Sequence, residues 1–161
     1  MKKITKILVV SAILTMLFAM PVMAREVSFS SDNTDYLITL LNNNTAKLQG
    51  ELAAFAKVQC GPNAQAVIAN QTALVNAKIA AVNKECAQNH LECLGKKVYN
   101  DKQFEATRLN QLNWFKTLAQ GSSTWNDEVA AAQKEYDAAV AKTAADSAYL
   151  ATAQAKLAPY L

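Results

Sequence analysis

Three side chains that can bind metal ions lie close together in the middle of the chain: Cys86, His90 and Cys93. Their i, i+4, i+7 spacing places them within a narrow arc of an α-helix, because each residue turns the helix by about 100°. Thiolate and imidazole groups suit Zn²⁺ or Cu⁺, although a closed site needs a fourth ligand, and metal-binding spacings usually include a turn. The alternative is that both cysteines are small apolar residues of a helix seam, with His90 as a partly exposed neighbour.

The chain has three cysteines, an odd number. Along an intact helix Cys86 and Cys93 are about 10.5 Å apart, whereas a disulfide needs Cα atoms within about 7 Å. A bridge between them requires the helix to unwind around residues 88–91, which an oxidising compartment would favour. Roughly 35 to 40 Å of helix separates Cys60 from Cys86. We therefore expect no intramolecular disulfide of Cys60, and a free thiol or an intermolecular bridge.

The sequence lacks the patterns of common catalytic sites. A single histidine leaves little for acid–base catalysis. The four glycines are too scattered to form a phosphate-binding loop, and no G-x-S-x-G motif occurs. Acidic pairs such as Asp127 and Glu128 fit the first turn of a helix, where the helix dipole favours them. We expect that the protein is not an enzyme.

Three aromatic residues, Trp114, Phe115 and Trp125, bracket a turn at Gly121. Tryptophan and other aromatic residues are favoured anchors of protein interfaces. Trp114 and Phe115 are neighbours on a helix, so they cannot easily face the same core. These three residues are therefore candidates for a protein interface. The alternative is a small aromatic core that closes the end of a helical bundle.

An alanine-rich composition predicts long helices, since Ala loses no side-chain entropy on becoming helical. Glycine and proline mark where these helices should end. We expect helices over residues 34–59, 64–94, 101–120 and 124–158, with turns at Gly61, Gly95 and Gly121. The expected N-caps are Ser31 or Asp32, Asn100 and Thr124. A break at the asparagine run 42–44 is an alternative for the first helix.

Apolar residues recur at helical spacing on each of these segments. The expected seam of the second helix alternates steps of four and three residues, as in a coiled coil. The expected seam of the fourth helix has a large residue at every seventh position, with alanines between these residues. In chain order, the inward residues expected on the four helices are Leu37, Leu41, Leu48, Leu52 and Phe55; Ile68, Thr72, Val75, Ile79, Val82, Cys86, Asn89 and Cys93; Phe104, Leu112, Phe115 and Leu118; and Val129, Ala132, Tyr136, Ala139, Thr143, Leu150, Ala153 and Leu157.

These patterns predict an all-α fold over residues 34–161, an antiparallel, up-down-up-down bundle of three to four helices with coiled-coil-like, Ala-rich seams. Short turns between long helices imply antiparallel neighbours. The turns at Gly61 and Gly121 are expected at one end of the bundle, and the turn at Gly95 at the other.

The N-terminus has the pattern of a cleavable signal peptide over residues 1–24, with a basic start, an apolar run and Ala24 before the cut. An extended segment over residues 25–33 follows. Three of the 16 basic residues leave with the signal peptide, so 13 basic and 13 acidic residues remain and the net charge is near zero. Nucleic-acid binding needs a basic surface and is not expected, nor is stable membrane insertion after cleavage.

We therefore expect a secreted protein, periplasmic or extracellular, that acts by binding another protein or by self-assembly, as adhesins, chaperones and structural proteins do. The alternative is a four-helix bundle that binds a metal ion, Zn²⁺ or Cu⁺, or a small ligand at the face of Cys86, His90 and Cys93. No other cofactor is expected.

Overall fold

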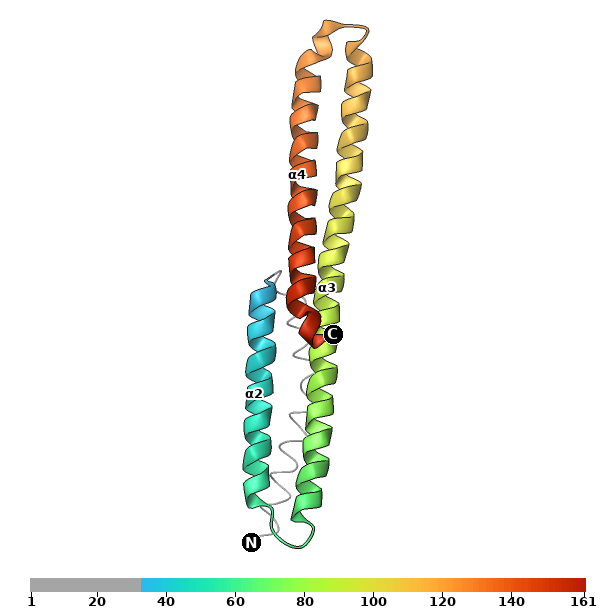
Figure 1. Ribbon diagram of the computed structural model, residues 1–161. Coiled ribbons are helices and arrows are strands. Elements are labelled where there is room, and N and C mark those ends of the chain that lie inside the picture. Colours follow the sequence, from blue (N-terminus) through green and yellow to red (C-terminus); the bar gives the residue numbers. More distant parts are fainter. Residues whose placement is uncertain (1–32) are drawn as a thin grey trace, which may run out of the picture. The chain divides into compact units, whose positions relative to one another are not determined.

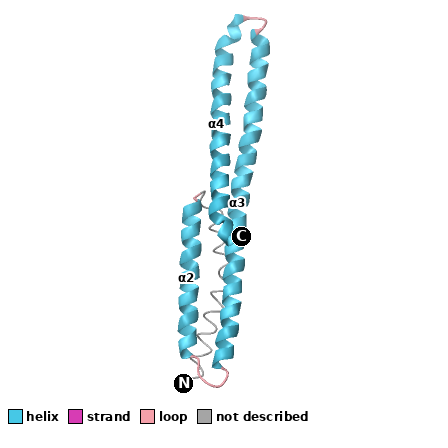
Figure 2. Ribbon diagram, in the orientation of Figure 1, coloured by secondary structure: helices cyan, strands magenta, loops and turns pink. Residues whose placement is uncertain are grey.

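The computed structural model describes residues 33–161, which are almost entirely helical (Figure 1). Three α-helices follow one another: α2 (Thr34–Val58), α3 (Ala64–Ala119) and α4 (Asn126–Leu157). Two short 3₁₀ helices, η1 (Ser123–Trp125) and η2 (Ala158–Tyr160), flank α4. The described chain contains no strand (Figure 2). The all-α prediction with three to four helices is thus confirmed, with three α-helices in the described part of the chain. The expected signal peptide and residues 25–32 lie outside the described residues.

The chain forms two compact units. The first unit ends at His90 and also includes the chain end, Leu157–Leu161, whereas the second comprises Leu91–Lys156. In the first unit α2 packs antiparallel to the beginning of α3. In the second unit α4 packs antiparallel to the later part of α3 (Figure 1). Each unit is therefore a helical hairpin closed by a short turn.

Asn33 begins α2, because its side-chain oxygen accepts hydrogen bonds from the backbone N–H groups of Asp35 and Tyr36. The N-cap expected at Ser31 or Asp32 is thus wrong by one or two residues. The helix also runs unbroken through residues 42–44. Tertiary packing outweighs the poor helix propensity of the asparagines, since buried residues recur at the heptad spacing on either side of them: Thr34, Leu37, Leu41, Leu48 and Phe55.

The turn expected at Gly95 is wrong, because α3 is one helix of 56 residues that passes through this position. The expected third helix with its cap at Asn100 is therefore the second half of α3. A glycine inside a helix costs only about 1 kcal/mol relative to alanine. Burial of Leu94 and Val98 on either side of Gly95 offsets that cost. By contrast, Gly61 has a φ of 105° and is followed by Pro62, and there the helix does begin anew.

Downstream of Cys86 the buried residues of α3 are Ala87, His90, Leu94, Val98 and Leu112, and from Cys86 to Val98 a buried residue recurs every four positions. The expected seam went through Asn89 and Cys93 instead, since it assumed alternating steps of four and three. Each four-residue step advances the buried line by about 40° around the helix, so three in succession leave Cys93 exposed. Phe104, also expected to face inward, is exposed.

The seam of α4 is confirmed, with its alanines and Thr143 buried. Its start differs from the prediction, because Ser122 rather than Thr124 provides the cap, and it caps η1. Large buried apolar residues are few in the second unit, and ion pairs join its two helices instead. These pairs are Lys97–Asp146, Arg108–Glu135 and Lys142–Asp101.

Candidate functional site

The proposed metal ligands Cys86, His90 and Cys93 share one side of α3 but differ in their surroundings. Cys86 and His90 are buried, with exposed fractions of 3% and 2%, while Cys93 is exposed. His90 also has a hydrogen-bond partner, because its Nε2 lies 3.1 Å from Oγ1 of Thr34 at the start of α2. The side chain of His90 thus fastens the first turn of α2 to α3.

Within residues 33–161 no group of three or more His, Cys, Asp or Glu side chains is arranged to hold a metal ion. The structure accordingly does not bring Cys86, His90 and Cys93 together as a ligand set. Metal binding at this face stays a prediction from the sequence, and the geometry adds no support to it.

The continuity of α3 decides whether Cys86 and Cys93 can form a disulfide with each other. The helix does not unwind between Cys86 and Cys93, which a disulfide between them would require. Burial, aided by the nearby charge of Glu85, raises the pKa of the Cys86 thiol to about 11. The thiol is therefore protonated and unreactive at neutral pH, since the thiolate is the nucleophile.

The three candidate interface residues Trp114, Phe115 and Trp125 form one aromatic cluster in the second unit. Trp114 and Phe115 have ring centroids 4.9 Å apart, and Trp125 of η1 lies 6.5 Å from Trp114 and 6.2 Å from Phe115. These tilted contacts fall in the favourable range for aromatic pairs. The cluster therefore fixes η1 against the end of α3.

The three rings of the aromatic cluster differ in their exposure to solvent. Phe115 and Trp125 are half-buried, whereas 57% of Trp114 is exposed. Two rings thus close the hairpin end, as in the alternative of an aromatic core, and the third presents its surface to solvent. A large aromatic ring that is held in place yet exposed is suited to contact another molecule, because little side-chain freedom is left to lose on binding.

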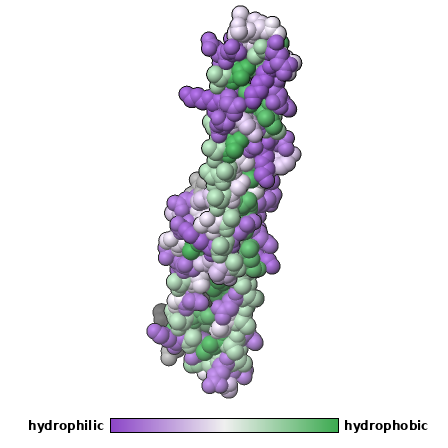
Figure 3. Space-filling view, turned by 45° about the horizontal axis from the view of Figure 1, so that its top comes forward, coloured by the Kyte–Doolittle hydropathy of each residue, from purple (hydrophilic) through white to green (hydrophobic). Residues whose placement is uncertain are grey.

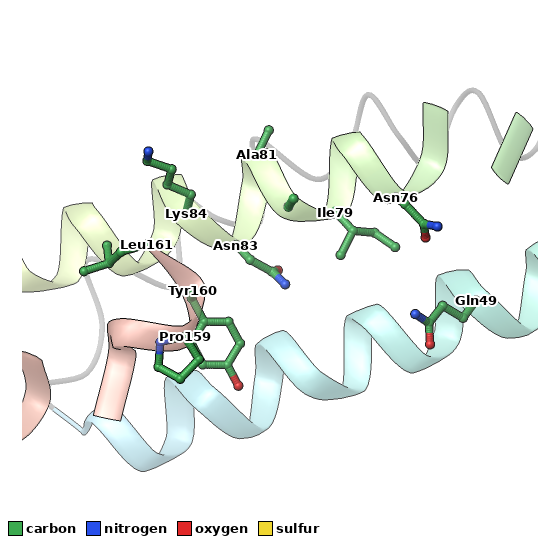
Figure 4. Close-up of a pocket in the computed structure, with 10 residues that line it drawn as sticks. Gln49, Asn76, Ile79, Ala81, Asn83, Lys84, Pro159, Tyr160 and Leu161 are labelled. Carbon is green, nitrogen blue, oxygen red and sulfur yellow. The ribbon is translucent and has the colours of Figure 1, made fainter. Parts of the chain in front are cut away.

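A second candidate site, which the sequence analysis missed, is a groove in the first unit with a volume of about 610 Å³. Helices α2 and α3 and the last three residues of the chain line it (Figure 4). Asn42 and Gln49 on α2, and Asn76 and Asn83 on α3, are each seven residues apart, so each pair lies on one helix face. This repeat of amides is the one signal that could have indicated the groove.

The chain end is held against α2 by Tyr160, whose hydroxyl donates a hydrogen bond of 2.8 Å to Oδ1 of Asn42. Leu157, the last residue of α4, is fully buried. Beside this contact, Nδ2 of Asn83 donates to Oγ1 of Thr45 over 3.3 Å. Uncharged polar contacts therefore link the elements that border the groove.

No helix among the described residues is both long and apolar enough to span a membrane. Comparisons with protein-family models, with curated proteins and with solved structures found no match to this chain.

Proposed function

We propose that this chain is a secreted, non-catalytic protein that acts by protein–protein binding or self-assembly, with the aromatic cluster Trp114, Phe115 and Trp125 as its contact surface. The observation that carries the proposal is the exposure of Trp114 on a support of two half-buried rings. Tryptophan is among the residues that contribute most binding energy when a partner covers them.

Three other properties of the molecule agree with this role. Further apolar side chains remain at the surface of the molecule among hydrophilic ones (Figure 3). The second unit has a thin core, in which Leu94, Val98 and Leu112 are the only large apolar residues buried and alanines supply much of the rest, so a partner that covers apolar surface there would add stability. The net charge near zero expected after signal cleavage favours a protein partner over nucleic acid.

The first test separates a contact residue from a core residue. We expect Trp114→Ala to lower the free energy of unfolding by less than about 1 kcal/mol, since most of the ring is already in water. Truncation of a buried Trp would cost about 3 to 5 kcal/mol. Urea unfolding followed by circular dichroism measures the difference. A loss in the larger range would assign Trp114 to the core and contradict the proposal.

The second test measures association. Tyr99 is a matched control, because it is an aromatic residue of α3 in the same unit, is 62% exposed and does not belong to the cluster. Light scattering over a range of concentrations should show self-association of the native chain and of Tyr99→Ala, and a weaker association of Trp114→Ala.

A further inference from the structure

The groove of the first unit has features of a binding site separate from the aromatic cluster. Its volume of about 610 Å³ lies within the range of ligand sites in proteins, which is about 300–1,000 Å³. Ile79 and Ala80 supply apolar lining, and Pro159 and Tyr160 form a wall. Its opening to solvent suits a chain that lies along the surface better than an enclosed small molecule.

The lining is uncharged where it faces the space between α2 and α3. Figure 4 shows Asn76 and Asn83 of α3 pointing toward α2, on which Gln49 also lines the groove. Lys84, the one charged side chain of the lining, points to the other side of α3 (Figure 4). A charged group placed between these amides would lose hydration without gaining an opposite side-chain charge, so this part of the lining favours an uncharged ligand.

The amides that face the groove have capacity to spare for hydrogen bonds. The side chains of Gln49 and Asn76 make no hydrogen bond within the described part of the chain, and Asn83 uses only its Nδ2 group. Each amide can both donate and accept, which is also the pattern of a peptide group. The three side chains can therefore pair with the backbone of an extended peptide.

The chain itself supplies a precedent for a peptide on these helices. Its last residues lie against α2 through the hydroxyl of Tyr160 and the amide oxygen of Asn42. The stretch of α3 from Asn76 to Lys84 rises about 12 Å. An extended peptide rises about 3.3 Å per residue, so about four residues fit along this stretch.

We propose that the groove binds an extended, uncharged peptide segment of a partner protein, about four residues long, through the amides of Gln49, Asn76 and Asn83. One apolar side chain of the segment would lie on Ile79 and Ala80. This contact is independent of the aromatic cluster, which belongs to the other unit.

The probe is a library of random heptapeptides displayed on phage, from which peptides that bind the full chain are selected. Enriched peptides are then synthesised with a fluorophore, and their affinity is measured by anisotropy. We expect enriched peptides to share four or more consecutive uncharged residues. Asn76→Leu should weaken their binding about tenfold or more, because it removes hydrogen bonds to the peptide.

Asn70→Leu is the matched control, because Asn70 is also an exposed asparagine of α3 but does not line the groove. The affinity of Asn70→Leu for the enriched peptides should stay within about twofold of the native value. Both variants should have the melting temperature of the native chain, since neither side chain is buried. Failure to enrich any peptide would overturn the proposal, as would equal binding to Asn76→Leu and the native chain.

Two further outcomes would also overturn it. Peptides that lose affinity with Trp114→Ala and not with Asn76→Leu would belong to the aromatic cluster. Self-association that Asn76→Leu abolishes would identify a second copy of the chain as the occupant instead of a partner's peptide.

Discussion

Replacing Gly95 by alanine tests the correction to the predicted topology. Gly95 lies inside α3, and a Cβ atom added there would meet no atom within 4 Å beyond its chain neighbours and the backbone of its own helix. Alanine lowers the entropy of the unfolded chain and fits the helix without strain. We therefore expect Gly95→Ala to raise the free energy of unfolding by about 1 kcal/mol.

The sign of the effect distinguishes the two topologies. A glycine that ends a helix adopts a left-handed conformation, in which alanine costs about 1–2 kcal/mol. A turn at Gly95 would therefore make Gly95→Ala destabilising. Gly61 has such a left-handed conformation, with a φ of 105°.

Urea unfolding followed by circular dichroism at 222 nm provides the measurement, with two control variants. Gly50 also lies inside a helix with open space around its Cβ position, so Gly50→Ala should stabilise. Gly61→Ala should destabilise, because of its backbone conformation. A Gly95→Ala protein that loses stability as Gly61→Ala does would refute the continuous α3.

Two other predictions concern ionisable groups. The hydrogen bond from Lys142, with the charges of Lys97 and Lys142 adding to it, lowers the pKa of Asp146 to about 2. The stability gained from this carboxylate is therefore present above its ordinary pKa near 4 and is lost as the pH falls toward 2. Asp146→Asn should flatten the pH dependence of unfolding in that window, and an unchanged slope would contradict the assignment. Iodoacetamide should alkylate exposed Cys93 quickly and Cys86 only after denaturation, as peptide mapping would show, because burial keeps the Cys86 thiol protonated.

Local signals in the sequence predicted much of the fold. Gly61 with Pro62, and Gly121 with its serines, mark turns because glycine and proline together stop a helix. The heptad spacing of α4 predicted its buried alanines, since steps of three and four residues alternate along the seam except for one step of seven after Thr143. Gly95 misled the prediction, because a lone glycine is also tolerated in a helix whose neighbours are well buried.

The candidate sites were less predictable, since they depend on contacts between distant residues. Spacing placed Cys86, His90 and Cys93 on one arc, but it could not show that Thr34 contacts His90 or that Cys93 faces solvent. The contact of Tyr160 with Asn42 joins residues 118 positions apart, and no local pattern specifies such a pair.

The most direct test of binding through the aromatic cluster is the mass of the chain in solution by light scattering, measured from micromolar to millimolar concentration. Self-association predicts a mass that rises above that of the monomer for the native chain and for Tyr99→Ala. Trp114→Ala should stay close to the monomer mass over the same range, while retaining the helical spectrum of the native chain. Equal masses for all three proteins at every concentration would contradict assembly through Trp114.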